Sequence, residues 1–396
     1  MRPKLCYVLP MYRRDADEHF VHTVDFLRRL SQQVQLTVLV ERGEAPVIPG
    51  AEVHLLPQGN RAGRIAGLLY HAVRLRWRGY RTFFVRISVP AALSLCLLRP
   101  LGILTYYWNS GMAKEVKPAW SCSWPVIKEK LTRELPFWLT LRMVHRLVTG
   151  PERMVQYYAG AYGVSPDRIV VCYNDINPDR FTVASPSQKA LAHRALGLPA
   201  GRKIILSVHR HSPIRRPLFY YPEIIRAVGE KDPNVLFVLV GGGPQEAELR
   251  ARLKALGLDP FVRWVGPVPN LWLPQYYHAA DLFIMPSWVE GFPRVLLEAM
   301  ATGVPFVTTD AGGVEDILTP LQRQYMIPRE DRRRFSEAVL TLLGDEKTRQ
   351  ALAADGLARV QRFTTARVVE MYLDRVVCPG RSCGDGGSEV SSNRTA

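Results

Sequence analysis

Several features that would define other classes of protein are absent from this sequence. Its six cysteines show neither a CxxC motif nor metal-ligand spacing, and Cys6 and Cys172 lie in apolar, strand-like runs. We therefore expect reduced core thiols, not a disulfide framework or a zinc site. The longest apolar stretch, residues 91–108, is interrupted by Arg99-Pro100 and is too short on either side to cross a bilayer. With no leader pattern before the first apolar run, the sequence predicts a cytoplasmic protein.

Acidic residues are scarce in the first half of the chain. The net charge is +16, and residues 1–198 contain 27 Lys/Arg against 14 Asp/Glu. Residues 61–86 contain seven arginines and no acid, and helical spacing places Ile65, Leu68 and Ala72 on one face. Such a helix can bind an anionic membrane surface, or it can pack on the core with its arginines in solvent. No nucleic-acid-binding motif accompanies the charge, so no nucleic-acid partner is expected.

Residues 281–318 carry the most informative pattern in the chain. They alternate as strand, loop, helix, strand and loop, with Pro293 at the predicted helix start and Gly303 at its end. In an open α/β sheet such loops lie at the carboxyl ends of the strands, where ligands bind, and a helix N-terminus attracts anions. Glu290 precedes the helix and Glu298 lies within it. Carboxylates beside an anion site accept hydrogen bonds from hydroxyls, so this combination suggests a nucleotide or a nucleotide-sugar.

The two carboxylates and their neighbours resemble the E-x7-E signature of the retaining GT-B glycosyltransferases of the GT4-type family. The matching residues are Glu290, Gly291, Phe292, Pro293, Glu298, Ala299, Met300, Ala301, Gly303 and Pro305. The resemblance covers about residues 140–375. It implies that Glu298 accepts hydrogen bonds from the ribose of the donor and that Glu290 contacts the transferred sugar. It also implies that backbone N–H groups of Gly291, Phe292 and Arg294, the residue after Pro293, contact that sugar.

Two further loops of the second half fit the same resemblance. Arg210 and Arg215 follow a predicted strand with the five-residue spacing of an Arg and a Lys that hold the donor diphosphate in the family. A guanidinium suits phosphate oxygens well, so Arg in place of Lys preserves the charge. Gly242 and Gly243 follow the apolar run 235–240 and form a turn that can approach a ligand closely.

The first half departs from the family motifs. The loop 10–18 lacks the usual glycine-rich turn, and Asn109 stands where many relatives have a histidine. Asn109 and His19 are candidates for the acceptor side, although an asparagine cannot act as a general base near neutral pH. The family element N-G-x-D-x-x-x-F is matched in part, with Asp175 in place of the glycine and Asn177 in place of the aspartate.

The alternation of strands and helices predicts an α/β protein of GT-B architecture, with two doubly wound, Rossmann-like domains facing across a cleft. The predicted parts are an acceptor-side domain (1–190), a nucleotide-sugar-binding domain (200–363), a C-terminal helix crossing back to the first domain (364–377) and a disordered tail (378–396). Residues 183–201, rich in proline and glycine, are interpreted as the linker.

The resemblance implies a retaining glycosyltransferase that needs neither a metal nor a cofactor. Its donor would be a nucleotide-sugar, UDP- or GDP-linked. The basic first domain favours a glycan or lipid-linked acceptor, a role in cell-surface polysaccharide or glycolipid synthesis, and a place at the inner membrane face. Two alternatives remain open. One is a catalytically silent GT-B subunit that binds a partner or a lipid, and the other is an epimerase or phosphorylase of the same fold.

Overall fold

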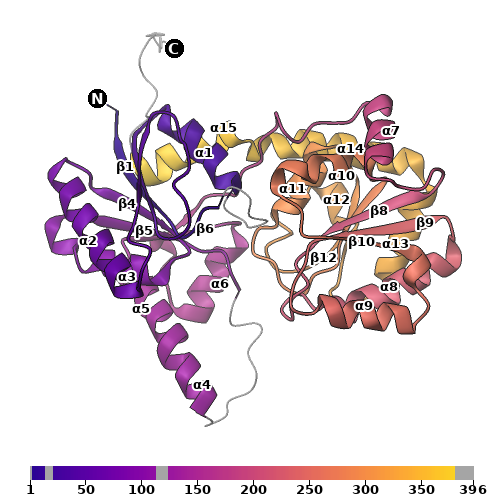
Figure 1. Ribbon diagram of the computed structural model, residues 1–396, viewed down its shortest axis with the longest axis horizontal. Coiled ribbons are helices and arrows are strands. Elements are labelled where there is room, and N and C mark those ends of the chain that lie inside the picture. Colours follow the sequence, from indigo (N-terminus) through magenta and orange to yellow (C-terminus); the bar gives the residue numbers. More distant parts are fainter. Residues whose placement is uncertain (1, 14–20, 113–123, 380–396) are drawn as a thin grey trace, which may run out of the picture.

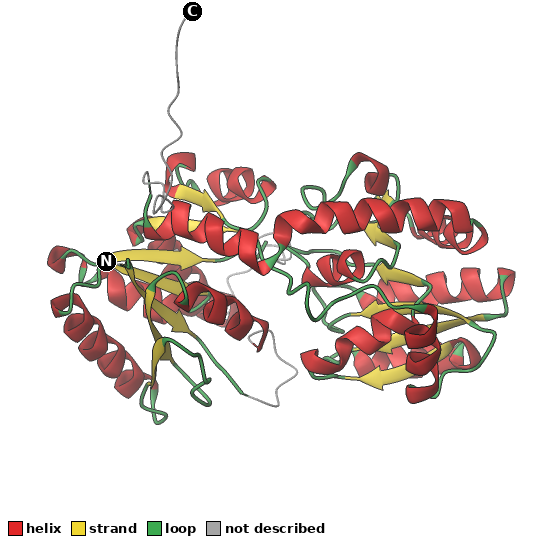
Figure 2. Cartoon of the chain, turned by 90° about the horizontal axis from the view of Figure 1, so that it is seen from above, coloured by secondary structure: helices red, strands yellow, loops and turns green. Residues whose placement is uncertain are grey.

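The computed structural model describes residues 2–13, 21–112 and 124–379, which form two α/β domains side by side (Figure 1). Each domain has one parallel sheet with helices on both of its faces, as the view from above shows (Figure 2). The predicted fold class is confirmed: both domains are doubly wound, and the arrangement is that of GT-B proteins.

The first domain contains a seven-stranded sheet in the order β3-β2-β1-β4-β5-β6-β7. Its strands are β1 Lys4–Leu9, β2 Gln35–Val40, β3 Ala51–Leu55, β4 Thr82–Arg86, β5 Leu104–Trp108, β6 Arg146–Thr149 and β7 Ile169–Val171. The α-helices of the described residues are α1 Val21–Ser31, α2 Arg61–Trp77, α3 Val89–Cys96, α4 Trp124–Glu129, α5 Leu135–Met143 and α6 Arg153–Tyr162. A π-helical turn, Lys130–Glu134, joins α4 to α5 without a break.

The second domain contains a six-stranded sheet in the order β10-β9-β8-β11-β12-β13. Its strands are β8 Lys203–Val208, β9 Val235–Val240, β10 Val262–Gly266, β11 Leu282–Met285, β12 Phe306–Thr309 and β13 Met326–Ile327. Its helices are α7 Pro186–Ala195, α8 Pro217–Lys231, α9 Glu246–Ala255, α10 Leu273–Ala279, α11 Arg294–Ala301, α12 Pro320–Arg323, α13 Arg332–Gly344 and α14 Glu346–Val360.

The composition of the central strands explains why the sheets are covered on both faces. All six residues of β9 are buried, and so are five of the six in β1 and β2. Continuous apolar runs of this kind are typical of parallel strands between two layers of helices. The strand order reverses beside β1 in one domain and beside β8 in the other. Ligands bind at such switch points, outside the carboxyl ends of the strands.

The stretch interpreted as a linker contains a helix. Within residues 183–201, α7 begins at a capping box in which the side chains of Ser185 and Gln188 each bond the other residue's backbone N–H. This helix packs on the second domain, where Lys189 Nζ lies 2.6 Å from a carboxylate oxygen of Asp281. The chain between the domains is therefore shorter than the composition indicates.

The helix that follows the second domain returns to the first. α15, Thr365–Tyr372, lies beside α1 in Figure 1. The ring of Tyr372 packs against Phe26 and Phe84, with centroids 4.8 Å and 5.3 Å away. The backbone N–H of Thr365 donates to the carbonyl of Ile176 at 3.0 Å. The crossing helix thus closes the core of the first domain. Residues 380–396 of the expected tail lie outside the described residues.

The basic helix α2 packs on the core of its domain. Leu68, Ala72 and Leu75 are buried on its inner face, whereas Arg61 and Arg74 are exposed on the outer one. The apolar face of α2 therefore covers the core, and only its outer face, which carries the arginines, is available to a membrane surface. Among the helices that the structure describes, none has the length and apolar character needed to cross a bilayer.

Candidate active site

The loop 286–293, here called the Glu290 loop, joins β11 to α11 and holds Glu290 at the carboxyl end of the second sheet. The Glu290 carboxylate accepts hydrogen bonds from Arg215 Nε (2.7 Å) and Nη2 (3.2 Å) and from the hydroxyl of Ser287 (3.0 Å). Burial alone would lower the pKa of Arg215, but the Glu290 carboxylate outweighs burial and raises this pKa. Glu290 and Arg215, which the resemblance places at the transferred sugar and the diphosphate, therefore form one largely buried ion pair.

Backbone contacts hold the Glu290 loop between other loops of the site. The N–H of Glu290 donates to the carbonyl of Ala311 at 2.7 Å, and the N–H of Gly313 donates to the carbonyl of Glu290 at 3.0 Å. A Cβ atom at Gly291 would collide with the carbonyl oxygen of Ser110, which follows β5 in the first domain. Only glycine lets the two domains approach so closely at this position.

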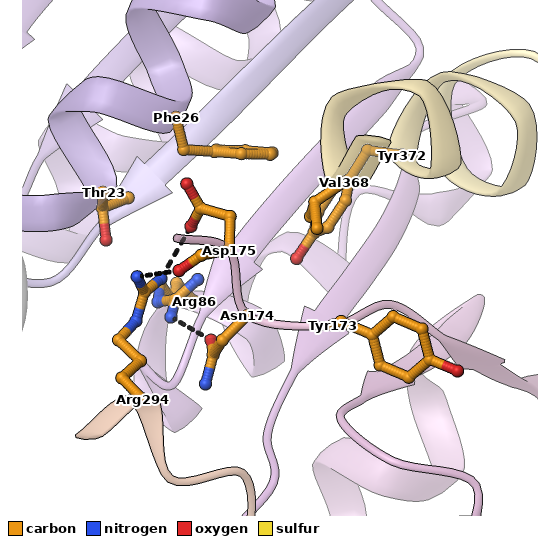
Figure 3. Close-up of a pocket in the computed structure, with 9 residues that line it drawn as sticks. All are labelled: Thr23, Phe26, Arg86, Tyr173, Asn174, Asp175, Arg294, Val368 and Tyr372. Carbon is orange, nitrogen blue, oxygen red and sulfur yellow. Dashed lines mark hydrogen bonds and ion pairs between the residues drawn. The ribbon is translucent and has the colours of Figure 1, made fainter. Parts of the chain in front are cut away.

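The residues after Gly291 contact the first domain through their side chains. The buried Phe292 ring packs against Tyr173 and Phe363, with centroids 5.6 Å and 5.7 Å away. Pro293 is the N-cap of α11, so the helix begins one position after the expected start. Arg294 is the first residue of α11, and its guanidinium reaches Asp175 of the first domain (Figure 3). The contacts expected between the backbone of these residues and a sugar stay a prediction.

Arg210 differs from Arg215 in its exposure to solvent. It is exposed, at the tip of the loop that follows β8. The glycine turn after β9 supports this loop, because the N–H of His211 donates to the carbonyl of Gly242 at 3.0 Å. A Cβ at Gly243 would collide with the carbonyl oxygen of His211. The glycine turn therefore packs closely against the arginine loop. Its approach to a ligand and the binding of an anion by Arg210 stay predictions.

Glu298 lies on α11 at the seam between the domains. It is 5% exposed, and its carboxylate accepts a hydrogen bond from the hydroxyl of Tyr277 at 2.8 Å. Burial raises the pKa of this carboxyl group. The side chain lines a cavity of about 10 Å³ together with Asn270 of its own domain and Arg180 of the first. Such a cavity holds at most one water, so in this conformation a ribose does not fit there.

The structure gives Asn109 a packing role. Its amide donates to the hydroxyl of Tyr107 at 3.2 Å, while its side-chain oxygen accepts from Tyr158 and from the N–H of Gly111, both at 2.8 Å. These contacts orient the loop after β5. His19, the other acceptor-side candidate, lies outside the described residues, as does most of the loop 10–18.

Several charged residues of the site were missed by sequence reasoning. Arg153, at the start of α6 in the first domain, forms ion pairs with Asp310 (3.2 Å) and Glu315 (3.1 Å) of the second. The guanidinium of Arg216 lies 3.6 Å from the ring centroid of Trp288, in the Glu290 loop. Because the paired residues are far apart in sequence, no local pattern indicates them. Asp175 is the exception, since it stands out as a departure from the family motif.

Among known proteins, one family profile matches most of the second domain. Residues 188–358 match the profile of the family described as glycosyl transferases group 1. The D-inositol 3-phosphate glycosyltransferase of Thermobispora bispora is 30% identical over 59% of this chain and 56% of its own length. The enzyme of the same name from Nocardia farcinica is 28% identical over 62% of this chain and 55% of its own. The chain thus matches only about half the length of these relatives.

Solved structures resemble almost the whole chain. The Anabaena protein Alr3699/HepE, crystallised with UDP-glucose, superimposes with a TM-score of 0.74 at 18% identity, covering 94% of this chain and 99% of the other. WaaG, a glycosyltransferase involved in lipopolysaccharide biosynthesis, gives a TM-score of 0.71 at 17% identity, covering 94% and 100%. At this identity the likeness establishes the fold. Residues 188–358 therefore match the profile of the group 1 glycosyltransferases, in a chain with the two-domain GT-B fold.

Proposed function

We propose that this protein is a retaining glycosyltransferase that moves a sugar from a nucleotide-sugar to a hydroxyl of a glycan or lipid-linked acceptor. The observation that carries the proposal is the bidentate Glu290–Arg215 pair, held beside the N-terminus of α11 and against the first domain. The acceptor oxygen would bond to the anomeric carbon as the bond from that carbon to the diphosphate breaks. The hydroxyl proton would leave with the diphosphate.

The roles of the residues follow from their chemistry. Exposed Arg210 and paired Arg215 would bind the diphosphate and neutralise the charge that develops as it leaves. A diphosphate beside Arg215 would compete with Glu290 for the guanidinium, which frees carboxylate lone pairs for hydroxyls of the transferred sugar. Glu298, with Tyr277 and Asn270 around it, would accept hydrogen bonds from the ribose. Because two arginines supply the positive charge, we propose that the reaction requires neither a metal nor a cofactor.

Donor binding is the first test of this function. We expect one of UDP-, GDP-, ADP- or CMP-linked sugars to raise the melting temperature with EDTA present throughout. A ligand at one hundred times its Kd adds about 2.7 kcal/mol to the stability of the protein that binds it. The shift should disappear in Arg210→Ala and in Glu298→Ala. The matched control is Arg252→Ala, which removes an exposed arginine on α9. This variant should keep the donor-dependent shift.

Two results would contradict the proposal. A donor shift that persists undiminished in both site variants would place the donor elsewhere. No shift with any nucleotide, in a protein that melts cooperatively, would favour the catalytically silent subunit. If a shift depends on added Mg²⁺ and is lost in EDTA, the metal-independent part of the proposal fails while the glycosyltransferase remains.

We also propose that the first domain meets an anionic membrane surface, where a lipid-linked acceptor would reside. The support is a patch at the C-terminal end of α2 and around α3, in which Trp77, Leu97 and Leu101 are 87%, 66% and 48% exposed. Arg76 lies beside Leu101 and donates to its carbonyl oxygen at 2.6 Å. Exposed tryptophan and leucine among arginines suit the boundary between lipid headgroups and acyl chains.

A further inference from the structure

A buried charged cluster joins the two domains at the N-terminus of α11, where Arg294 meets Asp175 and Arg86 meets Asn174 (Figure 3). Arg294 of the second domain donates to Asp175 twice, from Nη2 to the carboxylate at 2.8 Å and from Nη1 to the backbone carbonyl at 2.5 Å. The second carboxylate oxygen of Asp175 accepts from the hydroxyl of Thr365 at 2.8 Å. One aspartate therefore connects the first domain, the first turn of α11 and the crossing helix α15.

Asn174 adds a second connection to the Glu290 loop. Its amide donates to the backbone carbonyl of Phe292 at 3.0 Å, and its side-chain oxygen accepts from Arg86 Nη2 at 3.1 Å. Arg86 ends β4, and its guanidinium lies 4.2 Å from the ring centroid of Trp108. Asn174 is thus held from the first domain while it holds the loop of the second.

The charge balance makes this cluster sensitive to single changes. Arg86 and Asp175 are 7% and 4% exposed, and the side chain of Arg294 is 17% exposed. Both Arg86 and Arg294 interact with the carboxylate of Asp175, so its removal alone would leave two buried guanidinium groups without this partner. Removal of Asp175 and Arg294 together leaves the net charge of the cluster unchanged. The Asp175–Arg294 pair can therefore be dissected by comparing single and paired substitutions.

We propose that Asp175 and Asn174 are positioning residues, which act through Arg294 and Phe292 to fix the Glu290 loop against the first domain. This inference rests on the proposed function, in which that loop meets the sugar. The two contacts bracket Pro293, and Glu290 lies only two residues before Phe292, so a shift at this point carries Glu290 with it. Because Asp175 stands where the family motif has glycine, its contact with Arg294 belongs to this chain, whereas Asn174 is the asparagine of the motif.

The paired variant Asp175→Asn with Arg294→Gln tests the proposal. It removes both charges but keeps the size and much of the hydrogen-bonding capacity, so we expect a melting temperature within a few degrees of wild type. Displacement of the Glu290 loop should lower kcat by about 10- to 100-fold, as small errors in catalytic geometry do, with a smaller change in donor KM. Backbone amides of residues 286–296 should exchange hydrogen faster. Asp232→Asn, which breaks the Lys203–Asp232 pair (2.9 Å) on the far side of its domain, is the control.

The outcomes separate this inference from the proposed function. If the wild-type protein binds no donor, the proposed function fails, and exchange at residues 286–296 still reports whether the cluster fixes the loop. Wild-type kcat and wild-type exchange in the paired variant would overturn the inference and leave the pair as an adhesive contact between domains. If the paired variant does not fold, the same measurements are made on Asn174→Ala. That substitution removes the hydrogen bond to the Phe292 carbonyl and the one from Arg86.

Discussion

Glu298 is a residue whose proposed binding role opposes its contribution to stability. Burial raises the pKa of its carboxyl group above the ordinary value, so the folded protein retains this proton to higher pH than the unfolded chain does. The stability that the protonated group contributes is fully present below the unfolded-state pKa and is lost as the pH rises through the folded-state pKa. If the binding site keeps the Glu298 carboxyl group charged at neutral pH, the folded protein is less stable than it would be with an uncharged group there.

We expect Glu298→Gln to raise the melting temperature at pH 7 and to abolish the donor-dependent shift. The amide oxygen can still accept the hydrogen bond from Tyr277, and no charge has to be buried. This gain in melting temperature should shrink as the pH is lowered toward the ordinary pKa of a glutamate, because the wild-type carboxyl group is then also uncharged. Melting curves of both proteins between pH 4 and pH 8 check this. A constant difference across that range would show that the carboxyl group is not the cause.

At the scale of elements, α15 determines how the second half of the chain contributes to the first domain. Tyr372 is 2% exposed, and its ring fills the space between Phe26 and Phe84. Tyr372→Ala should cost about 3 to 5 kcal/mol, the usual range for deleting a large buried aromatic side chain. Tyr372→Phe keeps the ring and is the matched control. Thermal unfolding measures the loss, and a wild-type melting temperature for the alanine variant would mean that α15 adds little to this core.

How far the sequence predicts the elements depends on how local the cause is. The strand, loop and helix of residues 281–301 were predicted because apolar periodicity, Pro293 and Gly303 act within a few positions. The helix α7 was missed because Pro186, Pro199 and Gly201 favoured a linker, although Ser185 and Gln188 form a capping box that marks its start. A local pattern marked the helix in both stretches, but the capping box of α7 was given less weight than the prolines and glycine around it.

Contacts between distant residues could not be predicted from those patterns. The ion pairs of Asp175 with Arg294 and of Arg153 with Asp310 join positions more than one hundred residues apart. The resemblance brought Glu290 and Arg215 into one predicted site, and the structure confirms that they lie together. The resemblance did not indicate that Glu290 and Arg215 form an ion pair with each other, because it assigns each of them to a different part of the donor.

At the scale of the molecule, the seam between the domains limits access to the site. Arg153 and Asp175 make charged contacts across it at two separate places, and the cavity beside Glu298 is too small for a sugar. A donor that enters through this cavity would require the domains to separate, and closure would then exclude water from the reacting groups. The contacts that hold the domains together are therefore expected to influence both donor entry and the geometry of the closed state.

The distribution of charge over the molecule leads to the last prediction, which concerns the membrane. Most of the net charge lies in the first domain, and the patch around Trp77 combines it with exposed apolar side chains. Each basic residue near an anionic surface contributes about 1 kcal/mol. Changing Arg74, Arg76 and Arg78 together to Gln should therefore weaken binding to phosphatidylglycerol vesicles by about 100-fold in a sedimentation assay, somewhat less because Arg78 is already paired with Glu52.

The matched control changes Arg226, Arg252 and Lys254, three exposed basic residues on α8 and α9 of the second domain. It alters the net charge by the same amount, so it separates a specific surface from a general attraction between a basic protein and an anionic vesicle. Equal losses in the two triple variants would mean that only the total charge matters. Unchanged binding in the α2 variant would place the membrane contact elsewhere. A selective loss, reinforced by Trp77→Ser and absent with neutral phosphatidylcholine vesicles, would assign the membrane surface to this end of the first domain.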